Sequence, residues 1–536
     1  MNDAELRAAL GRRDAYPDRP PNVELRETHI SWVFLAGARA YKLKKPLVLP
    51  FLDYGTPERR RQMCEEEVRL NRRLAPDVYL GVRGVAASNG GVELTDSEDP
   101  RAIDFLVEMR RYDERRTVAA QLERGELTRA QIREVARTLA LFHADCAQID
   151  GADHGALRIE REVDRNIEEL LGATTLSADR HHVRLLARFM SAFVVSHRED
   201  LDARAAQGLV RDCHGDLRAE HVLLESPVKV VDCVEFDPSL RALDVADDLA
   251  FLVMDLAALG GERFAKELVE AYRAAGGDCG EDSLLSFFAV HRALVRAKVL
   301  LARAAQLPGG SAAHGHISAQ ARESLALAEC YSWGARLPMV IVVCGVPASG
   351  KSHLASALAH ASRLPLLSSD VVRKRLAGIR PTSTARAEHY SEQFNRATYR
   401  ELGLQASAEV RRHGGALVDA TFRHRRDRQA FAEALAGAAP VLFVECLAPV
   451  AVLVDRALRR RRDPGRISDA DLDVVLRERE QWEPLEEVHA FAHLPLRTDR
   501  PLGETVEDLR ALLDRRLEGG QSRSVVFRIA PSGSPG

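Results

Sequence analysis

Lysine is scarce in this sequence, which has 8 Lys against 68 Arg among its 536 residues. Cysteine is sparse as well. None of the 8 Cys forms a C-x-x-C pair or stands at zinc-ligand spacing with His, which excludes a disulfide scaffold and a zinc ribbon. No run approaches about 18 uncharged apolar residues, and no apolar segment follows the first residues, so we expect no membrane span and no signal peptide. These absences predict a reduced, cytoplasmic protein.

A basic excess is also lacking, because 76 Lys and Arg face 79 Asp and Glu and give a net charge of −3. A protein whose whole surface binds nucleic acid is typically strongly basic, so the balance argues against that class and leaves only a local patch. Hydrophobic residues make up 46% and charged residues 29% of the chain, which is typical of globular domains and excludes a mostly disordered chain.

The sequence divides into two parts. A Gly/Ser/Ala-rich stretch at 307–318 predicts a loop, and a short, continuous apolar run follows Pro338, as in a buried parallel strand. We predict one domain over 1–330, with a small lobe to about 110 and a helical lobe after it, and a second domain over 338–515. Residues 516–536 end in Gly, Ser and Pro and are expected to form a flexible tail.

The first part opens with short strands and turns helical after about residue 128. Residues 31–37 and 38–46 predict a hairpin with Gly37 near its turn. Residues 57–76 predict a surface helix that Pro76 ends, and 102–111 predict a further strand. A small strand-rich lobe therefore precedes a larger helical one.

Residues that suit phosphoryl transfer stand in RDCHGDLRAEHVLL (211–224) and VKVVDCVEF (228–236). Asp216 lies in a predicted loop, and Asp232 follows a short apolar strand. One carboxylate can take the proton of an acceptor hydroxyl, while the other holds the metal ion that bridges the nucleotide phosphates. The scarce lysines also cluster at 42, 44 and 45, where a compact positive charge suits a phosphate contact.

These residues resemble the aminoglycoside phosphotransferase family, relatives of the protein kinases, over about 28–256. The tripeptide His-Gly-Asp that ends at Asp216 resembles the family's catalytic loop, which implies that Asp216 is catalytic. The resemblance implies that Asp232 is a metal ligand and that Lys42 is the strand lysine that binds the nucleotide. Glu66, one helical turn before Leu70, best matches the glutamate that pairs with this lysine, and Glu67 is the alternative.

The sequence departs from the family pattern at His221, where the family has an Asn metal ligand five positions after the catalytic Asp. Imidazole is a poor ligand for Mg²⁺, which prefers hard oxygen donors. Three readings stay open: a weak second metal site at His221, a direct contact of His221 with phosphate, or a lobe that binds nucleotide with little catalysis. Downstream, Asp244, Asp247 and Asp248 are expected to cap helices and brace loops rather than to catalyse.

A glycine-rich phosphate loop, Gly-x-x-x-x-Gly-Lys-Ser, follows the apolar run of the second part and precedes a predicted helix. Its glycines let backbone N–H groups face phosphate oxygens, and the helix N-terminus adds its dipole. The lysine is expected to reach the terminal phosphates, and the serine hydroxyl to bind Mg²⁺. The predicted nucleotide-binding residues are Gly345, Val346, Pro347, Ala348, Ser349, Gly350, Lys351 and Ser352.

Two further apolar strands end in Asp370 and Asp419, at the sheet edge where open α/β sheets bind ligands. With the phosphate loop, the segment Ser369-Asp370-x-x-Arg373 resembles P-loop kinases of the polynucleotide kinase, zeta toxin and chloramphenicol phosphotransferase type, over about 339–495. The resemblance implies that Asp370 is the general base and that Arg373 lies beside the acceptor. Asp419 is a candidate contact to a metal-bound water or to the acceptor, or a strand-end brace.

An arginine-rich run at 455–472 resembles the mobile lid of those kinases, and the alternative is a solvated helix face. Arg456 and Arg459 are the candidates for neutralising charge on the nucleotide during transfer. The order of the two parts resembles bacterial fusions of an aminoglycoside phosphotransferase-like domain with a P-loop kinase-like domain.

The predicted fold is therefore α/β and α+β in two modules: an N-terminal bilobal protein-kinase-like fold and a C-terminal three-layer α/β/α P-loop fold with a parallel sheet. The predicted function is transfer of the γ-phosphate of ATP, with Mg²⁺, to a hydroxyl of a small molecule at two nucleotide sites. Two alternatives are kept: an N-terminal regulatory pseudokinase that controls the C-terminal kinase, and a nucleic-acid 5′-hydroxyl kinase. The sequence names neither acceptor and gives no oligomeric state.

Overall fold

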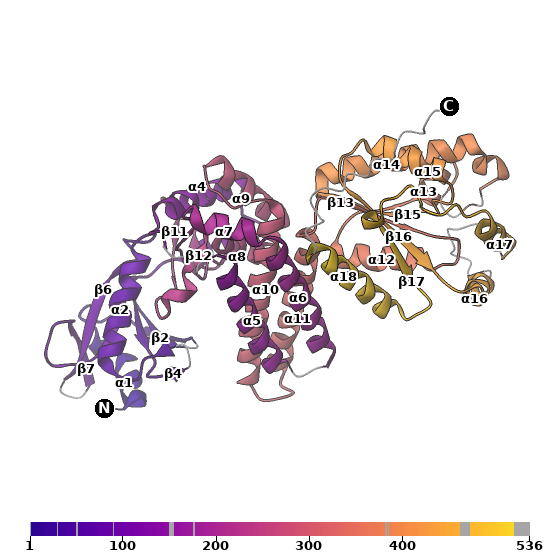
Figure 1. Ribbon diagram of the computed structural model, residues 1–536. Coiled ribbons are helices and arrows are strands. Elements are labelled where there is room, and N and C mark those ends of the chain that lie inside the picture. Colours follow the sequence, from indigo (N-terminus) through magenta and orange to yellow (C-terminus); the bar gives the residue numbers. More distant parts are fainter. Residues whose placement is uncertain are drawn as a thin grey trace. The chain divides into compact units, whose positions relative to one another are not determined.

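The computed structural model describes residues 2–28, 30–49, 52–88, 91–149, 155–174, 177–380, 383, 385–460 and 472–518 (Figure 1). Its contacts divide the chain into two compact units. The N-terminal unit is Met1–Gly155 with Asp200–Gly280, and the P-loop unit is Ala156–Glu199 with Glu281–Gly536. The units interleave along the sequence, whereas the predicted domains follow one another. Among the described residues, no helix has both the length and the apolar surface that a membrane crossing needs.

The small lobe of the N-terminal unit is a six-stranded antiparallel sheet in the order β1-β2-β3-β8-β6-β7. The predicted hairpin is confirmed, since β2 pairs with β3 so that Val33 lies opposite Lys42. The strands are β1 (Val23–Glu27), β2 (Ser31–Ala36), β3 (Arg39–Lys44), β6 (Tyr79–Ser88), β7 (Gly91–Asp96) and β8 (Ala102–Arg110), and a separate small hairpin joins β4 (Val48–Leu49) to β5 (Leu52–Asp53).

Two helices cover this sheet. Helix α2 (Pro57–Asn71) begins after Thr56, whose hydroxyl accepts a hydrogen bond from the Arg59 N–H, and Pro57 suits the first turn. Its buried Cys64 and Val68 pack in one core with residues of β3, β6 and β8. Helix α1 (Asp3–Leu10) places Leu6 and Leu10 in a second core with Phe34 and Leu106. The sheet is therefore buried on both faces, and α2 is fixed beside β3.

The rest of the N-terminal unit is mainly helical, as predicted, and its loops connect short paired strands. The helices are α3 (Val118–Glu123), α4 (Arg129–Asp145), α7 (Arg198–Ala206), α8 (Val245–Ala258) and α9 (Glu262–Ala274). The strands are β9 (Val210–Asp212), β10 (Val222–Leu223), β11 (Lys229–Val230) and β12 (Ala242–Asp244), and they form the pairs β9–β12 and β10–β11.

The P-loop unit contains a five-stranded parallel sheet in the order β14-β15-β13-β16-β17, as predicted for a three-layer α/β/α fold. Its central strand alternates between two cores: Val340 and Val342 face α14 and α15, whereas Ile341 and Val343 face α12 and α18 (Figure 1). The strands are β13 (Met339–Cys344), β14 (Leu366–Ser368), β15 (Gly415–Asp419), β16 (Val441–Leu447) and β17 (His493–Arg497). The helices are α12 (Lys351–Ser362), α13 (Ser369–Leu376), α14 (Glu392–His413), α15 (Arg425–Leu435), α16 (Val450–Arg460), α17 (Leu472–Glu480) and α18 (Leu502–Glu518).

Two sequence predictions about loops need correction. The stretch 307–318 is not all loop, because Ser311 caps a helix, α11 (Ala312–Gly334), by accepting a hydrogen bond from the His314 N–H. The predicted tail starts too early, because α18 continues to Glu518. Residues 519–536 lie outside the described residues.

Four long helices belong to the P-loop unit although they lie before its sheet in the sequence. They are α5 (Ala156–Ala173), α6 (Ser177–Ser196), α10 (Asp282–Ala305) and α11. Trp333, near the end of α11, is 2% exposed and packs in one core with Ile341 of the sheet, Leu354 of α12 and Leu509 of α18. Nearby, a buried ion pair joins Arg336 to Asp514 of α18. The end of α11 is thus part of the P-loop core.

We therefore expect Trp333→Ala to destabilise the P-loop unit by about 3–5 kcal/mol, because it removes a fully buried indole and leaves a cavity. Urea unfolding of the full chain measures the change. The control, Val299→Ala on α10, removes a half-exposed side chain of the same unit and should change the unfolding free energy by less than about 0.5 kcal/mol. Equal effects of the two variants would contradict the assignment of α11 to this core.

Candidate active sites

The loop that carries Asp216 is tied to the neighbouring strand by His214. Its Nε2–H donates to the Val231 carbonyl at 3.1 Å, and its Nδ1 accepts from the Asp216 N–H at 3.3 Å. Burial lowers the pKa of His214 to about 4, so the imidazole is neutral at pH 7 and keeps this donor–acceptor arrangement. Gly215 has a φ of +84°, and a Cβ there would meet the Leu240 carbonyl at 2.8 Å. The turn therefore requires glycine.

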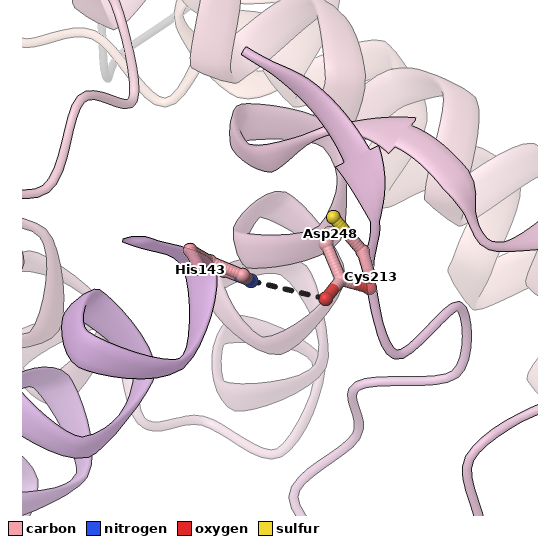
Figure 2. Close-up of side chains that lie close together, drawn as sticks. All are labelled: His143, Cys213 and Asp248. Carbon is pink, nitrogen blue, oxygen red and sulfur yellow. Dashed lines mark hydrogen bonds and ion pairs between the residues drawn. The ribbon is translucent and has the colours of Figure 1, made fainter. Parts of the chain in front are cut away.

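A buried cluster of His143, Cys213 and Asp248 lies behind this loop (Figure 2). Asp248, on α8, accepts hydrogen bonds from the His214 N–H at 3.1 Å and the Gly215 N–H at 2.9 Å. His143, on α4, contacts Asp248 through Nε2 at 3.1 Å and the Tyr272 hydroxyl through Nδ1 at 2.8 Å. These residue types can hold a metal ion, but their donors already bind protein groups. The cluster therefore explains how the loop that carries Asp216 is held, and it confirms Asp248 as a loop brace.

Lys42 and two carboxylates meet at the predicted nucleotide end of this site. Lys42 Nζ lies 2.7 Å from Asp232 Oδ1 and 2.9 Å from Glu67 Oε1. Burial opposes the charged form of Lys42, but Asp232 and Glu67 outweigh it and raise its pKa, and Lys42 in turn lowers the pKa of Asp232 below its usual range. Asp232 has a φ of +65°, an unusual conformation for a residue other than glycine.

Glu66 is not the partner of Lys42, so this sequence prediction was wrong and its alternative, Glu67, is correct. Glu66 instead pairs with Arg69 at 2.7 Å and with Arg241 at 3.5 Å. Successive helix residues point about 100° apart, so only one of the two neighbours can face the strand lysine.

His221 lies between the two predicted catalytic-site carboxylates. Its Nδ1–H donates to the Asp216 carbonyl at 2.9 Å, and Nδ1 lies 3.6 Å from Asp216 Oδ2. Its Nε2 lies 3.7 Å from Asp232 Oδ2. The structure thus brings Lys42, Asp216, His221 and Asp232 together, as the sequence predicted.

In the P-loop unit, the phosphate loop runs from the end of β13 to the start of α12. Gly345 and Gly350 have φ values of +137° and +97°, which glycine adopts without strain, and Ala348 has a φ of +67°. Lys351 and Ser352 form the first turn of α12, where the helix dipole favours an anion. The backbone at the predicted phosphate site thus has the curled conformation that a phosphate-binding loop requires.

Arg456 holds this loop from outside, a contact that the sequence did not reveal. Its guanidinium donates to the Ser349 carbonyl at 3.1 Å and to the Thr498 carbonyl, and the Thr498 hydroxyl also donates to Ser349 O at 2.5 Å. Arg459, by contrast, is 79% exposed and pairs with Asp455. Arg456 therefore stabilises the conformation of the phosphate loop, whereas the Arg459 side chain faces solvent.

A pocket of about 390 Å³ opens beside the start of α12. It is large enough for a nucleoside and is rich in cationic side chains. Its lining residues are Gly350, His353, Leu354, Arg456, Arg459, Thr498, Arg500, Leu502 and Thr505.

Asp419 ends β15, and β14 pairs with β15 so that Ser368 lies opposite Asp419. Asp370 follows Ser368 by two residues and lies in the first turn of α13. Burial raises the pKa of Asp370 although Lys351 and Arg373 favour its charged form. Asp419 lies on the same side of the sheet as Leu417, which packs against α12. The Asp419 Oδ1 atom is buried and has no hydrogen-bond partner among the described residues. An orphaned carboxylate oxygen beside a phosphate loop suits a hydrated Mg²⁺.

Arg373 is 5% exposed, and its guanidinium binds residues at and just before the start of α14. Its Nη1 donates to the Asn395 side chain at 2.5 Å and to the His389 carbonyl at 3.1 Å, and the guanidinium lies over the Tyr390 ring at 4.7 Å. Its Nε is buried with no partner in the described part of the chain. Arg373 therefore joins α13 to the start of α14, and its buried Nε finds no acceptor among the described residues.

Two family models match the chain: "Phosphotransferase enzyme family" over residues 48–282 and "AAA domain" over residues 340–485. Among curated proteins, uncharacterised proteins of Mycobacterium tuberculosis and Mycobacterium bovis are each 32% identical over 479 residues, which is 87% of this chain and 91% of theirs.

Two solved structures are each similar to part of this chain. A choline/ethanolamine kinase family protein from Mesorhizobium loti is 16% identical, with a TM-score of 0.35, and covers 61% of this chain and 99% of its own. A gluconokinase from Sinorhizobium meliloti is 23% identical, with a TM-score of 0.25, and covers 34% of this chain and 96% of its own.

Proposed function

We propose that this chain transfers the γ-phosphate of ATP to small-molecule hydroxyls at two sites. It belongs to one family with its mycobacterial relatives, and it joins an aminoglycoside phosphotransferase-like domain to a P-loop kinase domain. The observation that carries the proposal is the same in both units. A lysine and two carboxylates converge where a nucleotide phosphate and an acceptor would meet: Lys42, Asp216 and Asp232 in one, and Lys351, Asp370 and Asp419 in the other.

Mg²⁺ fits the N-terminal site because carboxylates outnumber lysines there: Glu67, Asp232 and Glu235 face Lys42 and Lys44. Asp232 is the most exposed of the three carboxylates, with 48% of its side chain accessible. Asp232 would hold the ion, with His221 as a weak additional ligand or a phosphate contact. In the P-loop unit, Ser352 and Asp419 would hold it, and the pocket beside α12 would take the nucleoside. A bound Mg²⁺ would supply positive charge that offsets the negative charge developing on the phosphates during transfer.

At each site the carboxylate of Asp216 or Asp370 accepts the proton of the acceptor hydroxyl. The acceptor oxygen forms the new bond to the γ-phosphorus while the bond to the ADP oxygen breaks, and the products are a phosphate monoester and ADP. Lys42 and Lys351 hold the phosphates in line, and the brace at Asp248 and the clamp at Arg456 keep the two loops in place.

A screen of the full chain with sugars, nucleosides, antibiotics and oligonucleotides, followed by transfer of labelled γ-phosphate, tests the proposal. Lys351→Ala should remove transfer at the P-loop site, and Asp232→Asn should remove it at the N-terminal site, so the double variant should be inactive. Transfer that survives in the double variant would contradict both assignments. A steep loss of acceptor affinity with salt would point instead to a nucleic-acid acceptor.

A further inference from the structure

A fully buried lysine, Lys44, lies two residues beyond Lys42 on β3. Side chains two apart on a strand point to the same face, and both lysines reach Glu67 on α2. Lys44 Nζ lies 2.6 Å from Glu67 Oε2 and also pairs with Glu235, and neither Lys44 nor Glu67 is exposed at all. A fully buried lysine is rare unless it is paired.

These contacts form one chain of alternating charge: Asp232, Lys42, Glu67, Lys44 and Glu235. Both ends of the chain lie on the same short segment, 232–235, which follows β11. One end is half exposed at the predicted metal ligand. The other end is buried, and Glu235 there also accepts a hydrogen bond from the Tyr54 hydroxyl at 2.7 Å.

The segment between the two ends is anchored at its backbone as well. The Asp232 N–H donates to the Tyr79 hydroxyl at 3.1 Å, and the Cys233 N–H donates to Asn71 Oδ1 at 2.9 Å. Asn71 lies on α2, the helix that carries Glu67. Strand β3, helix α2 and segment 232–235 are thus joined as one unit around the charge chain.

We propose that Lys44 and Glu235 are positioning residues that preset the N-terminal site for Mg²⁺–nucleotide. This rests on the proposed function of that site. Binding of Mg²⁺ by Asp232 and of phosphate by Lys42 must weaken the direct Lys42–Asp232 contact, which is the exposed link of the chain. The buried link between Lys44 and Glu235 then keeps Glu67 and segment 232–235 in place, so Lys42 and Asp232 stay aimed at the nucleotide.

The alternative role is purely structural, and the metal dependence of binding separates the two. Partners that orient a metal ligand typically change metal affinity about 10–100-fold when they are removed. A structural role would lower the melting temperature and leave the Mg²⁺ requirement of the folded protein unchanged.

The test uses the full chain carrying Lys351→Ala and a fluorescent ATP analogue, and it measures the Mg²⁺ concentration for half-maximal binding. The part of the binding that a further Asp232→Asn removes belongs to the N-terminal site. Lys44→Met and Glu235→Gln should each raise the Mg²⁺ midpoint of that part about 10–100-fold. The double variant removes one positive and one negative charge, which protects folding. It should raise the Mg²⁺ midpoint as much as the single variants do, because each substitution breaks the same series of ion pairs.

Lys45→Met is the matched control, since it removes the same charge from the next residue, whose partner is Glu27. It should leave the Mg²⁺ midpoint unchanged. Midpoints within twofold of the parent in the folded double variant would overturn the role of Lys44 and Glu235 and leave the nucleotide site standing. Mg²⁺-dependent binding that Asp232→Asn does not reduce would overturn this role and the proposed N-terminal site together.

Discussion

Asp370→Asn is expected to lower the turnover number of the P-loop site by about 10²–10⁴, because the amide cannot accept the proton of the acceptor hydroxyl. ATP affinity should stay nearly unchanged, since the phosphate loop and Lys351 are intact. Transfer to an acceptor found in the screen gives the turnover number, and equilibrium binding gives the affinity. An equal loss of ATP affinity would mark Asp370 as a metal ligand or a structural residue.

The same substitution should stabilise the fold at neutral pH. Burial raises the pKa of Asp370 above its ordinary value of 3.8, so the folded state favours the protonated acid, and this contribution to stability is lost as pH rises through the raised pKa. Asn carries no charge at any pH. The variant should therefore resist urea better than the parent at pH 7, and the difference should shrink toward pH 4. The rise of turnover with pH that Asp370 causes should disappear.

Asp427→Asn is the control for this prediction. Asp427, on α15, is 4% exposed, and burial raises its pKa in the same direction. Its replacement should also stabilise the P-loop unit at neutral pH but leave turnover intact. If both variants lost turnover equally, the loss would come from the changed electrostatics of the domain rather than from a missing base.

The parts of the fold and site that depend on local pattern were predictable from the sequence. The hairpin around Gly37, the helix that begins at Pro57 and the phosphate loop before Lys351 each follow from short-range periodicity and turn chemistry. The placement of Asp216 and Asp232 in one site, on either side of His221, was also predicted, because a family resemblance supplied the long-range proximity that spacing alone does not give.

Features that depend on packing between distant segments were not predictable. Glu66 and Glu67 differ by one helix position, and only the contact with β3 separates them. A signal for Lys44 did exist, since it shares a strand face with Lys42, but its partner Glu235 is 191 positions away. The grouping of α11 with the P-loop core depends on the packing of Trp333 against β13, α12 and α18, and no local sequence pattern predicts these contacts.

In the N-terminal site, Asp216→Asn should lower transfer by about 10²–10⁴ if that lobe is catalytic. The assay uses the full chain with Lys351→Ala, because the two compact units interleave and a fragment ending near 330 would separate α11 from the core that buries Trp333. The brace between Asp248 and the Gly215 N–H does not involve the Asp216 side chain, so the loop should keep its shape. Nucleotide binding should therefore persist in the variant.

His221→Asn distinguishes a catalytic lobe from a regulatory pseudokinase. Its imidazole lies 3.6–3.7 Å from carboxylate oxygens of Asp216 and Asp232, where an amide oxygen would offer Mg²⁺ the hard donor that a ring nitrogen does not. In a catalytic lobe the substitution should keep or raise transfer, and Asp216→Asn should abolish the gain. In a pseudokinase it should strengthen Mg²⁺-dependent nucleotide binding and create no transfer to any hydroxyl of the screen. We expect the first result, because Lys42, Glu67, Asp216 and Asp232 are all in place, and a lobe that only binds nucleotide has no need of Asp216.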